Sequence, residues 1–255
     1  MNERVLQLML DSFWQLLLPG LRITIPLTLI SFTLGLIIAL LTAVVQVANI
    51  QGLKQIARFY VWVIRGTPLI VQLFVVFFGL PDLGIVLDAF PAAVLVFSFN
   101  TGAYASEIIR AAIEAVPSGQ MEAGYCVGMN YVQIMARIVL PQAMRTAFPP
   151  LSNTLIGLVK DTSLAASITM AEMFMAAQRI AGRTYESFAM YMEVGLVYLL
   201  FCTHKRGWGW NRFLNEANAG DGLSFPNSVR FYVSFILPLI VLFIFVMGYW
   251  NQFGG

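Results

Sequence analysis

The side chains of this chain that could recognise a ligand are the few polar and charged groups that interrupt its apolar runs. Asn100, Tyr104 and Glu107 follow one another at spacings of four and three residues, so they share one face of a helix. Asp161 follows Lys160 at the end of another apolar run. In a membrane segment such groups are candidates for function by default. They could equally bond one helix to another, and Asp161 could simply pair with Lys160. The sequence leaves these roles open.

The composition places these residues in a membrane protein. Of the 255 residues, 59% are hydrophobic and only 11% are charged, whereas an ordinary soluble domain carries about 25% charged residues. That is too little charge to cover the exterior of a soluble protein of this size. The net charge of +2 is too small to indicate a nucleic-acid partner.

Metal and thiol chemistry have no support in the sequence. Cys126 and Cys202 lie far apart without CxxC spacing, and His204 is the single histidine. We therefore expect no metal site and no disulfide framework. Both cysteines are expected to pack as small apolar residues.

Five apolar stretches predict five transmembrane helices, since a hydrocarbon core requires ~20 apolar residues in a helix. The clearest lies between Arg22 and Lys54. The others are GTPLIVQLFVVFFGLP with the preceding FYVWVI, then Ala89 to Ser106, Leu140 to Val159 and Phe188 to Thr203, and an extra C-terminal helix begins at Phe231. Pro149 and Pro150 break the fourth stretch, which must face protein or a cavity. Glu193 in the fifth is expected to pair with an arginine inside the bundle.

The polar segment from Arg110 to Arg137 carries too many charges to span a membrane and should lie in the cytoplasm. Cytoplasmic loops are enriched in lysine and arginine. With the N-terminus outside, ten of the 15 basic residues fall on the inner side. The five on the outer side are Arg4, Arg22, Lys160, Arg179 and Arg183.

Within that segment, MEAGYCVGMNYVQIMARIVLPQA predicts a short surface helix, a glycine turn and a second helix. A surface helix can insert into a groove on a partner when apolar anchors lie on one face beside a few charges. Ala123 and Val127 could supply the anchors, and Glu122 the charge.

This segment resembles the EAA loop of ABC importer permeases, the coupling helix that docks on the ATPase subunit. The matching positions are Ser118, Gly119, Glu122, Ala123, Gly124, Gly128, Ile138, Leu140 and Pro141. Gly124 stands where that family usually has alanine, and we expect this difference to loosen the helix slightly.

Three further stretches narrow the resemblance to the polar amino acid branch of that family. They are Arg65-Gly66-Thr67-Pro68 with Val71-Gln72, the segment from Gly102 to Gln120, and Lys160-Asp161-Thr162-Ser163-Leu164. With the EAA loop they make four motifs in the family's order. Residues 1–203 therefore resemble the transmembrane domain of a type I importer permease, with the coupling helix at about residues 117–130.

The resemblance implies an all-α integral membrane fold and a function in amino-acid import. An extracellular or periplasmic binding protein would deliver the amino acid. A dimer of ATP-binding subunits would drive two permeases, either two copies of this chain or this chain and a homologue, by alternating access. Those partners would bind ATP and magnesium, so this chain is expected to hold no cofactor and no catalytic residue. It would be a multi-pass protein of the bacterial inner (plasma) membrane.

The resemblance also implies where the substrate passes. Asp161, followed by Thr162 and Ser163, resembles a substrate contact near the membrane midplane. Relatives that carry cationic amino acids have an acid after the asparagine that precedes this motif, whereas here Thr154 follows Asn153. That difference favours a neutral polar or sulfur-containing substrate, because a second cationic group requires a carboxylate. Arg65 could orient the substrate carboxylate or serve as an anchor at the inner boundary.

Residues 204–255 depart from the permease pattern. GWGWNRFLNEANAGDGL and the apolar run after it resemble the final loop and helix of bacterial sodium-coupled symporters of the neurotransmitter transporter family. The alternative function is therefore a fragment or chimera of a secondary, sodium-coupled amino acid transporter. A secondary carrier has no reason to keep a cytoplasmic docking helix, so the EAA loop favours the permease.

Overall fold

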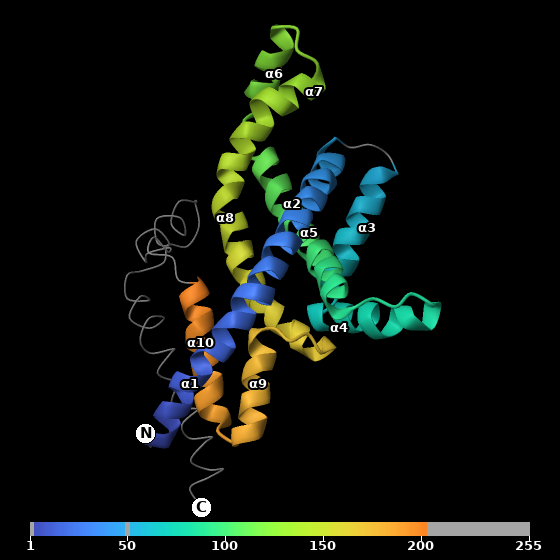
Figure 1. Ribbon diagram of the computed structural model, residues 1–255. Coiled ribbons are helices and arrows are strands. Elements are labelled where there is room, and N and C mark those ends of the chain that lie inside the picture. Colours follow the sequence, from blue (N-terminus) through green and yellow to red (C-terminus); the bar gives the residue numbers. More distant parts are fainter. Residues whose placement is uncertain (1–2, 49–51, 203–255) are drawn as a thin grey trace, which may run out of the picture. The chain divides into compact units, whose positions relative to one another are not determined.

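The computed structural model describes residues 3–48 and 52–202, and every regular element in those ranges is a helix (Figure 1). This confirms the all-α prediction for the described part of the chain. The predicted C-terminal loop and extra helix at 204–255 lie outside the described residues. The α-helices are α1 (Glu3–Pro19), α2 (Ile25–Val47), α3 (Leu53–Gly66), α4 (Leu69–Phe74), α5 (Ala89–Glu114), α6 (Ser118–Cys126), α7 (Tyr131–Ile134), α8 (Leu140–Asp161), α9 (Met173–Thr184) and α10 (Ser187–Cys202).

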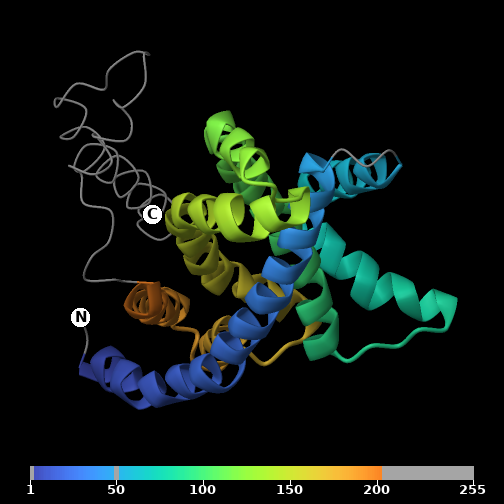
Figure 2. The same ribbon diagram turned by 90° about the horizontal axis from the view of Figure 1, so that it is seen from above.

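Tighter or wider helical turns join several of these helices. They are π-helical at Gly20–Thr24, Val75–Gly79 and Met135–Val139, and 3₁₀-helical at Leu80–Leu83 and Thr162–Ile168. The first of them makes Glu3–Val47 one continuous helix of 45 residues, which Figure 2 shows as a single long element. Pro19 lies directly before this turn, and its ring nitrogen has no hydrogen to donate to the carbonyl of Gln15.

Small residues let α2 and α5 approach closely. Gly35 on α2 lies against Thr101 on α5, where an added Cβ would meet the threonine side chain at 2.9 Å. Further along the same interface, Ala39 and Ala43 are buried with Ala105 in one cluster. Close packing of small residues is the usual way in which helices associate within membranes, where burial of apolar surface gives no advantage.

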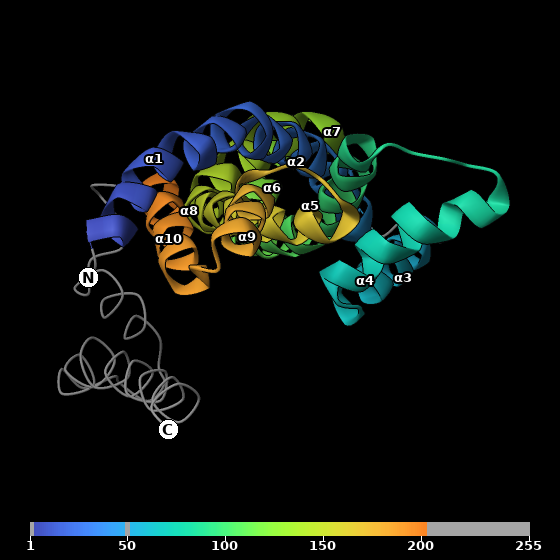
Figure 3. The ribbon, with the colours of Figure 1, turned by 60° about the horizontal axis from the view of Figure 1, so that its bottom comes forward.

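The second predicted span is bent in the structure. α3 ends at Gly66, Thr67 and Pro68 are extended, and the chain turns by 105° before the helical turns of Leu69–Leu83. The residue before a proline is disfavoured in helical geometry, which explains the position of the bend. In Figure 3, α3 and α4 lie on the side of α5 that faces away from α9 and α10.

Length and hydropathy mark two helices of the described residues, Glu3–Val47 and Ala89–Glu114, as able to cross a membrane, and the bent pair makes a third candidate. The predicted fourth and fifth spans correspond to α8 and to the apolar but shorter α10. α5 continues to Glu114, beyond the predicted end at Ser106. It does so because Glu107, Arg110 and Glu114 neutralise one another along one face.

Among the residues that the structure describes, no arginine pairs with Glu193, contrary to the prediction. This carboxylate on α10 is buried and accepts a hydrogen bond of 2.6 Å from the hydroxyl of Ser12 on α1. A hydroxyl donor adds no second charge to the interior, so it satisfies one carboxylate oxygen without the desolvation of a guanidinium group.

Candidate functional site

A cavity of about 690 Å³ lies where the end of α3, the bend after it, α5 and α8 meet. Most of the polar residues predicted for the substrate pathway line this cavity. They are Asn100, Tyr104, Glu107, Thr154 and Asp161, joined by Arg65, Thr67 and Pro68 of the bend and by apolar groups that include Leu69, Ile108 and Leu158. Three segments that are far apart in the sequence thus line one cavity. A mostly apolar lining with a few polar groups is typical of small-molecule sites.

The bend at Thr67 and Pro68 is held by Gln72, a residue to which the sequence assigned no role. The Gln72 amide nitrogen lies 2.7 Å from the carbonyl of Ile64, 3.1 Å from that of Thr67 and 2.9 Å from the Thr67 hydroxyl. Its amide oxygen accepts a hydrogen bond of 3.1 Å from Asn100 on α5. One side chain therefore closes the turn and fixes it to the opposite wall of the cavity.

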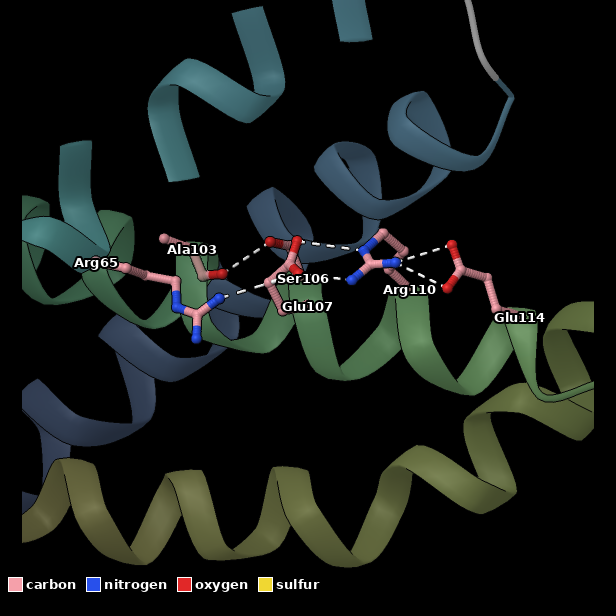
Figure 4. A network of polar contacts seen from close by, with 6 residues as sticks. All are labelled: Arg65, Ala103, Ser106, Glu107, Arg110 and Glu114. Atoms are coloured by element: carbon pink, nitrogen blue, oxygen red, sulfur yellow. Dashed lines mark hydrogen bonds and ion pairs between the residues drawn. The ribbon is translucent and has the colours of Figure 1, made fainter. Parts of the chain in front are cut away.

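A row of charges on α5 continues from the cavity (Figure 4). The guanidinium group of Arg65 lies over the ring of Tyr104, 5.2 Å from its centroid, and 4.0 Å from the carboxylate of Glu107. Glu107 also accepts from Arg110 at 2.8 Å, and Arg110 bonds both oxygens of Glu114 at 2.8 and 2.9 Å. Glu107 is thus neutralised by its neighbours, while Arg65 keeps one face toward the cavity.

Asp161 ends α8 and lines the cavity together with Thr154 and Gly157. Spacings of three and four residues place these positions on one face of the helix. Asp161 is exposed and, among the ion pairs of the described residues, none joins it to Lys160. Within the described ranges, Asp161 therefore presents to the cavity a carboxylate with no ion-pair partner.

Three of the predicted pathway residues, Thr162, Ser163 and Asn153, do not line the cavity. Thr162 is fully buried and donates to the carbonyl of Val159 at 2.7 Å, and Ser163 donates to the carbonyl of Lys160 at 2.7 Å. Both hydroxyls stabilise the 3₁₀ turn after Asp161 and leave none of their donors for a ligand. Asn153 and Gly66 are absent from the residues that line this cavity.

The predicted coupling segment forms the tip of the described chain, at the end of α8 opposite α9 and α10 (Figure 1). α6 ends in a glycine turn, because Gly128 has a φ of +79° that side chains disfavour. Asn130 then begins α7 with a capping box, in which its side chain accepts from the Gln133 amide while Gln133 bonds back. Helix, turn and helix therefore follow the predicted order.

The structure shows a packing role for Gly124 that helix propensity does not indicate. Gly124 is buried, and a Cβ placed on it would meet Cγ1 of Ile134 at 2.6 Å and Cδ1 at 2.9 Å. Ile134 itself is fully buried beneath α6. The glycine is thus a packing adaptation that lets the larger isoleucine fill the space between the two helices.

The outer face of this tip is open. Ser118, Gly119, Glu122 and Ala123 are exposed, as predicted for a docking helix. Large apolar side chains stand beside them: Val127 is 75% exposed, Val132 is 72% exposed and Tyr125 is 53% exposed. Val127 is one of the predicted docking anchors, whereas Tyr125 and Val132 are not. Their positions in the two helices on either side of the glycine turn could have indicated that they lie beside Val127.

These features define a membrane permease of the type I ABC importer fold. Residues 34–204 match the family described as binding-protein-dependent transport system inner membrane component, and the chain belongs to this family. The symporter-like residues lie at and beyond the end of that match, and the alternative of a sodium-coupled carrier has no support from it.

Several known proteins are similar to this chain. The L-cystine transport system permease protein TcyB of Bacillus subtilis (strain 168) is 49% identical over 193 residues, which cover 75% of this chain and 82% of the relative. The probable amino-acid ABC transporter permease protein YckA of the same strain is 38% identical over 77% of this chain and 87% of its own length. The crystal structure of an amino acid ABC transporter with histidines matches with a TM-score of 0.70 at 34% identity, covering 76% of this chain and 90% of that one.

Proposed function

We propose that this chain forms the translocation pathway for L-cystine or a closely related neutral amino acid. The observation that carries the proposal is the cavity between α3, α5 and α8, which combines one carboxylate without an ion-pair partner, Asp161, with one guanidinium group, Arg65, from a different helix. A zwitterionic amino acid needs both an acceptor for its ammonium group and a donor for its carboxylate.

The charge balance of the cavity favours a neutral side chain on the substrate. Glu107 is engaged by Arg110 and Arg65, so Asp161 is the acid that remains for the ammonium group. A side chain with a net positive charge would require a further acid, and the position after Asn153 holds Thr154 instead. L-Cystine carries one ammonium group and one carboxylate at each end, so it brings no net charge into the cavity. The L-cystine permease TcyB is 49% identical to this chain, whereas a second L-cystine permease, TcyL, and the arginine transport system permease protein ArtQ are both 38% identical. The similarity to TcyB supports the proposal, and the 38% matches do not separate the two substrates.

The proposed assembly contains a dimer of ATP-binding subunits, a second permease and an external binding protein. The exposed tip around Glu122, Ala123 and Gly128 would dock on the ATPase at the cytoplasmic face, which places the N-terminus outside. Support comes from the distribution of basic residues and from the row of exposed apolar side chains at the tip. We expect no catalytic residue in this chain, so the ATP-binding subunits would bind ATP and magnesium.

The test is uptake of labelled L-cystine by proteoliposomes that contain the complete complex. Asp161→Asn should reduce uptake by roughly 10- to 150-fold, the equivalent of the 1.5–3 kcal/mol that a hydrogen bond to a charged group contributes. Asn100→Ala is the matched control and should cost less, because Asn100 bonds Gln72 within the wall. Excess unlabelled L-cystine should compete and L-arginine should not.

Two results would contradict the proposal. The first is a larger loss of uptake in Asn100→Ala than in Asp161→Asn, which would remove Asp161 as the ammonium acceptor. The second is stronger competition by L-arginine than by L-cystine, which would show that the cavity selects a cationic substrate.

A further inference from the structure

The N–H groups of Arg65, at the edge of the substrate cavity, are not committed to a protein acceptor. The nearest carboxylate oxygen, on Glu107, lies 4.0 Å from Nη1, which is beyond hydrogen-bond distance. Within the described ranges, no hydrogen bond joins this guanidinium group to another residue. A guanidinium group has five N–H donors. Those of Arg65 can therefore serve a ligand, but the side chain still has to be held in place.

The ring of Tyr104 holds this side chain by a contact that uses none of those donors. The guanidinium carbon of Arg65 lies over the ring, 5.2 Å from its centroid. The attraction arises from the charge distribution of the aromatic ring and needs no N–H group. A carboxylate, in contrast, binds a guanidinium group at its edge through two parallel N–H bonds. The two contacts are thus compatible, and the first can prepare Arg65 for the second.

The two helices that carry this pair are fixed to each other nearby. Tyr60 on α3 donates a hydrogen bond from its hydroxyl to the carbonyl of Phe99 on α5, and the two rings pack edge to face. Gly102 leaves room for that hydroxyl, since an added Cβ would meet it at 2.8 Å. This contact between α3 and α5 keeps Arg65 within reach of Tyr104.

Tyr104 lines the substrate cavity as well, so two roles are open to it. It could contact the substrate directly through its hydroxyl, or it could support Arg65 through its ring. The contact that the structure shows is made by the ring. The two roles make different demands on the side chain, because only the first requires the hydroxyl.

We propose that Tyr104 is a positioning residue that determines the preference of this site for a substrate with a carboxylate, by holding Arg65 ready to bind that group. The inference rests on the proposed function, in which Arg65 receives the substrate carboxylate and Asp161 the ammonium group. An arginine that is already held loses less conformational freedom when the carboxylate binds. The ring of Tyr104 carries this role, and the hydroxyl does not.

The test is equilibrium binding of labelled L-cystine to the purified complex of permease and ATP-binding subunits. It is measured without the binding protein, so that the affinity of the permease itself is read. Cystamine, which keeps both ammonium groups of L-cystine but has no carboxylate, is measured in the same way. Tyr104→Leu should weaken binding of L-cystine about 2- to 5-fold, the equivalent of about 0.5–1 kcal/mol for an exposed cation–π contact, and leave cystamine binding unchanged. Tyr104→Phe keeps the ring and should bind both ligands like the wild type.

Two controls assign the effect to Arg65. In an Arg65→Gln background, Tyr104→Leu should cause no further loss of L-cystine binding, since the cation that the ring holds is gone. Tyr191→Leu on α10 is the matched control. Tyr191 and Tyr104 are both 43% exposed, and the ring of Tyr191 stacks on Phe174. This replacement should leave binding of both ligands unchanged.

Three results would overturn the inference. Equal losses of L-cystine binding in Tyr104→Phe and Tyr104→Leu would show a direct hydroxyl contact. Equal losses for L-cystine and cystamine in Tyr104→Leu would show that Tyr104 supports the cavity as a whole. Unchanged L-cystine binding in Tyr104→Leu would exclude any role in holding Arg65. Asp161→Asn tests the proposed function separately, because it should weaken binding of both ligands through their ammonium groups whatever Tyr104 does.

Discussion

Replacing Gly124 with alanine tests how the coupling tip is packed. The new methyl group would enter a space already occupied by Ile134, whose nearest atom lies 2.6 Å from the ideal Cβ position. That distance is well inside van der Waals contact, so Ile134 must leave its position or α6 must lift. Overpacking of this kind costs about 1–3 kcal/mol. Gly124→Ala is therefore expected to destabilise the contact of α6 with the helix beneath it.

A second substitution makes the prediction specific to this contact. Ile134→Ala removes the atoms that clash and should by itself cost about 2–5 kcal/mol, because it leaves a cavity. In that background Gly124→Ala should cost nothing further, since its methyl group enters the vacated space. The two changes should therefore be non-additive by about 1–3 kcal/mol.

Amide hydrogen exchange of the assembled complex measures this effect locally. A destabilisation of 1–3 kcal/mol would accelerate exchange in α6 roughly 5- to 150-fold in Gly124→Ala, and the double variant should exchange like Ile134→Ala. The transport-to-ATP ratio should fall in parallel. The packing argument fails if Gly124→Ala exchanges like the wild type, or if its effect is the same in both backgrounds.

Three further predictions concern the turn, the bend and the charge row. Gly128→Ala should lower the free energy of unfolding by about 1–2 kcal/mol, because alanine disfavours the positive φ at this position. Both Gly128→Ala and Glu122→Ala should lower the amount of substrate transported per ATP hydrolysed in proteoliposomes, while docking of the binding protein stays intact. Wild-type coupling in both variants would remove the assignment of this segment as the docking helix. Gln72→Leu should lower the thermal midpoint of the complex, because Ile64 and Thr67 lose their donor and Asn100 loses its acceptor. Gln72→Glu should lower it as well, because glutamate keeps only the acceptor and places a carboxylate oxygen against the two carbonyls; a wild-type midpoint in both variants would exclude Gln72 as the residue that holds the bend. Arg110→Gln should destabilise the complex by on the order of 1 kcal/mol. Adding Glu107→Gln should restore part of that loss of stability, measured by thermal unfolding. If the effects of the two substitutions on stability simply add, Arg110 and Glu107 are not coupled.

The coupling segment could be predicted from the sequence because its signals are local. A glycine turn between two helices is predicted in this segment, and the φ of +79° places that turn at Gly128. A capping box from Asn130 to Gln133 adds a second boundary that four adjacent residues determine. Interactions between near neighbours need no knowledge of the tertiary fold.

The substrate cavity could be predicted only in part, because helical register decides which side chains line it. Asp161 and Thr154 were identified, but Thr162 lies one residue beyond Asp161 and is fully buried. The change from α-helix to 3₁₀ turn at this point sets the rotation, and no sequence pattern fixed it. Gln72 was missed because its partner Asn100 is 28 residues away, so its role depends on the packing of α4 against α5.

Packing likewise determines whether alanine can replace Gly124. Helix propensity alone says that glycine weakens a helix by about 1 kcal/mol relative to alanine. The fully buried Ile134 reverses the preference, because it occupies the volume that an alanine methyl group would need. Tertiary contacts of this kind override local propensity and are invisible in a single sequence.

The continuous helix from Glu3 to Val47 has a mechanical consequence. Its N-terminal part packs on α9 and α10, and its C-terminal part packs along α5, the helix that carries Asn100 and Glu107 into the substrate cavity. The 23 residues of α2 extend about 35 Å from the π-helical turn. A tilt of about 5° at that turn would therefore displace the far end of α2 by about 3 Å. A small change of angle at the π-helical turn after Pro19 would thus be converted into a larger displacement of the end of α2.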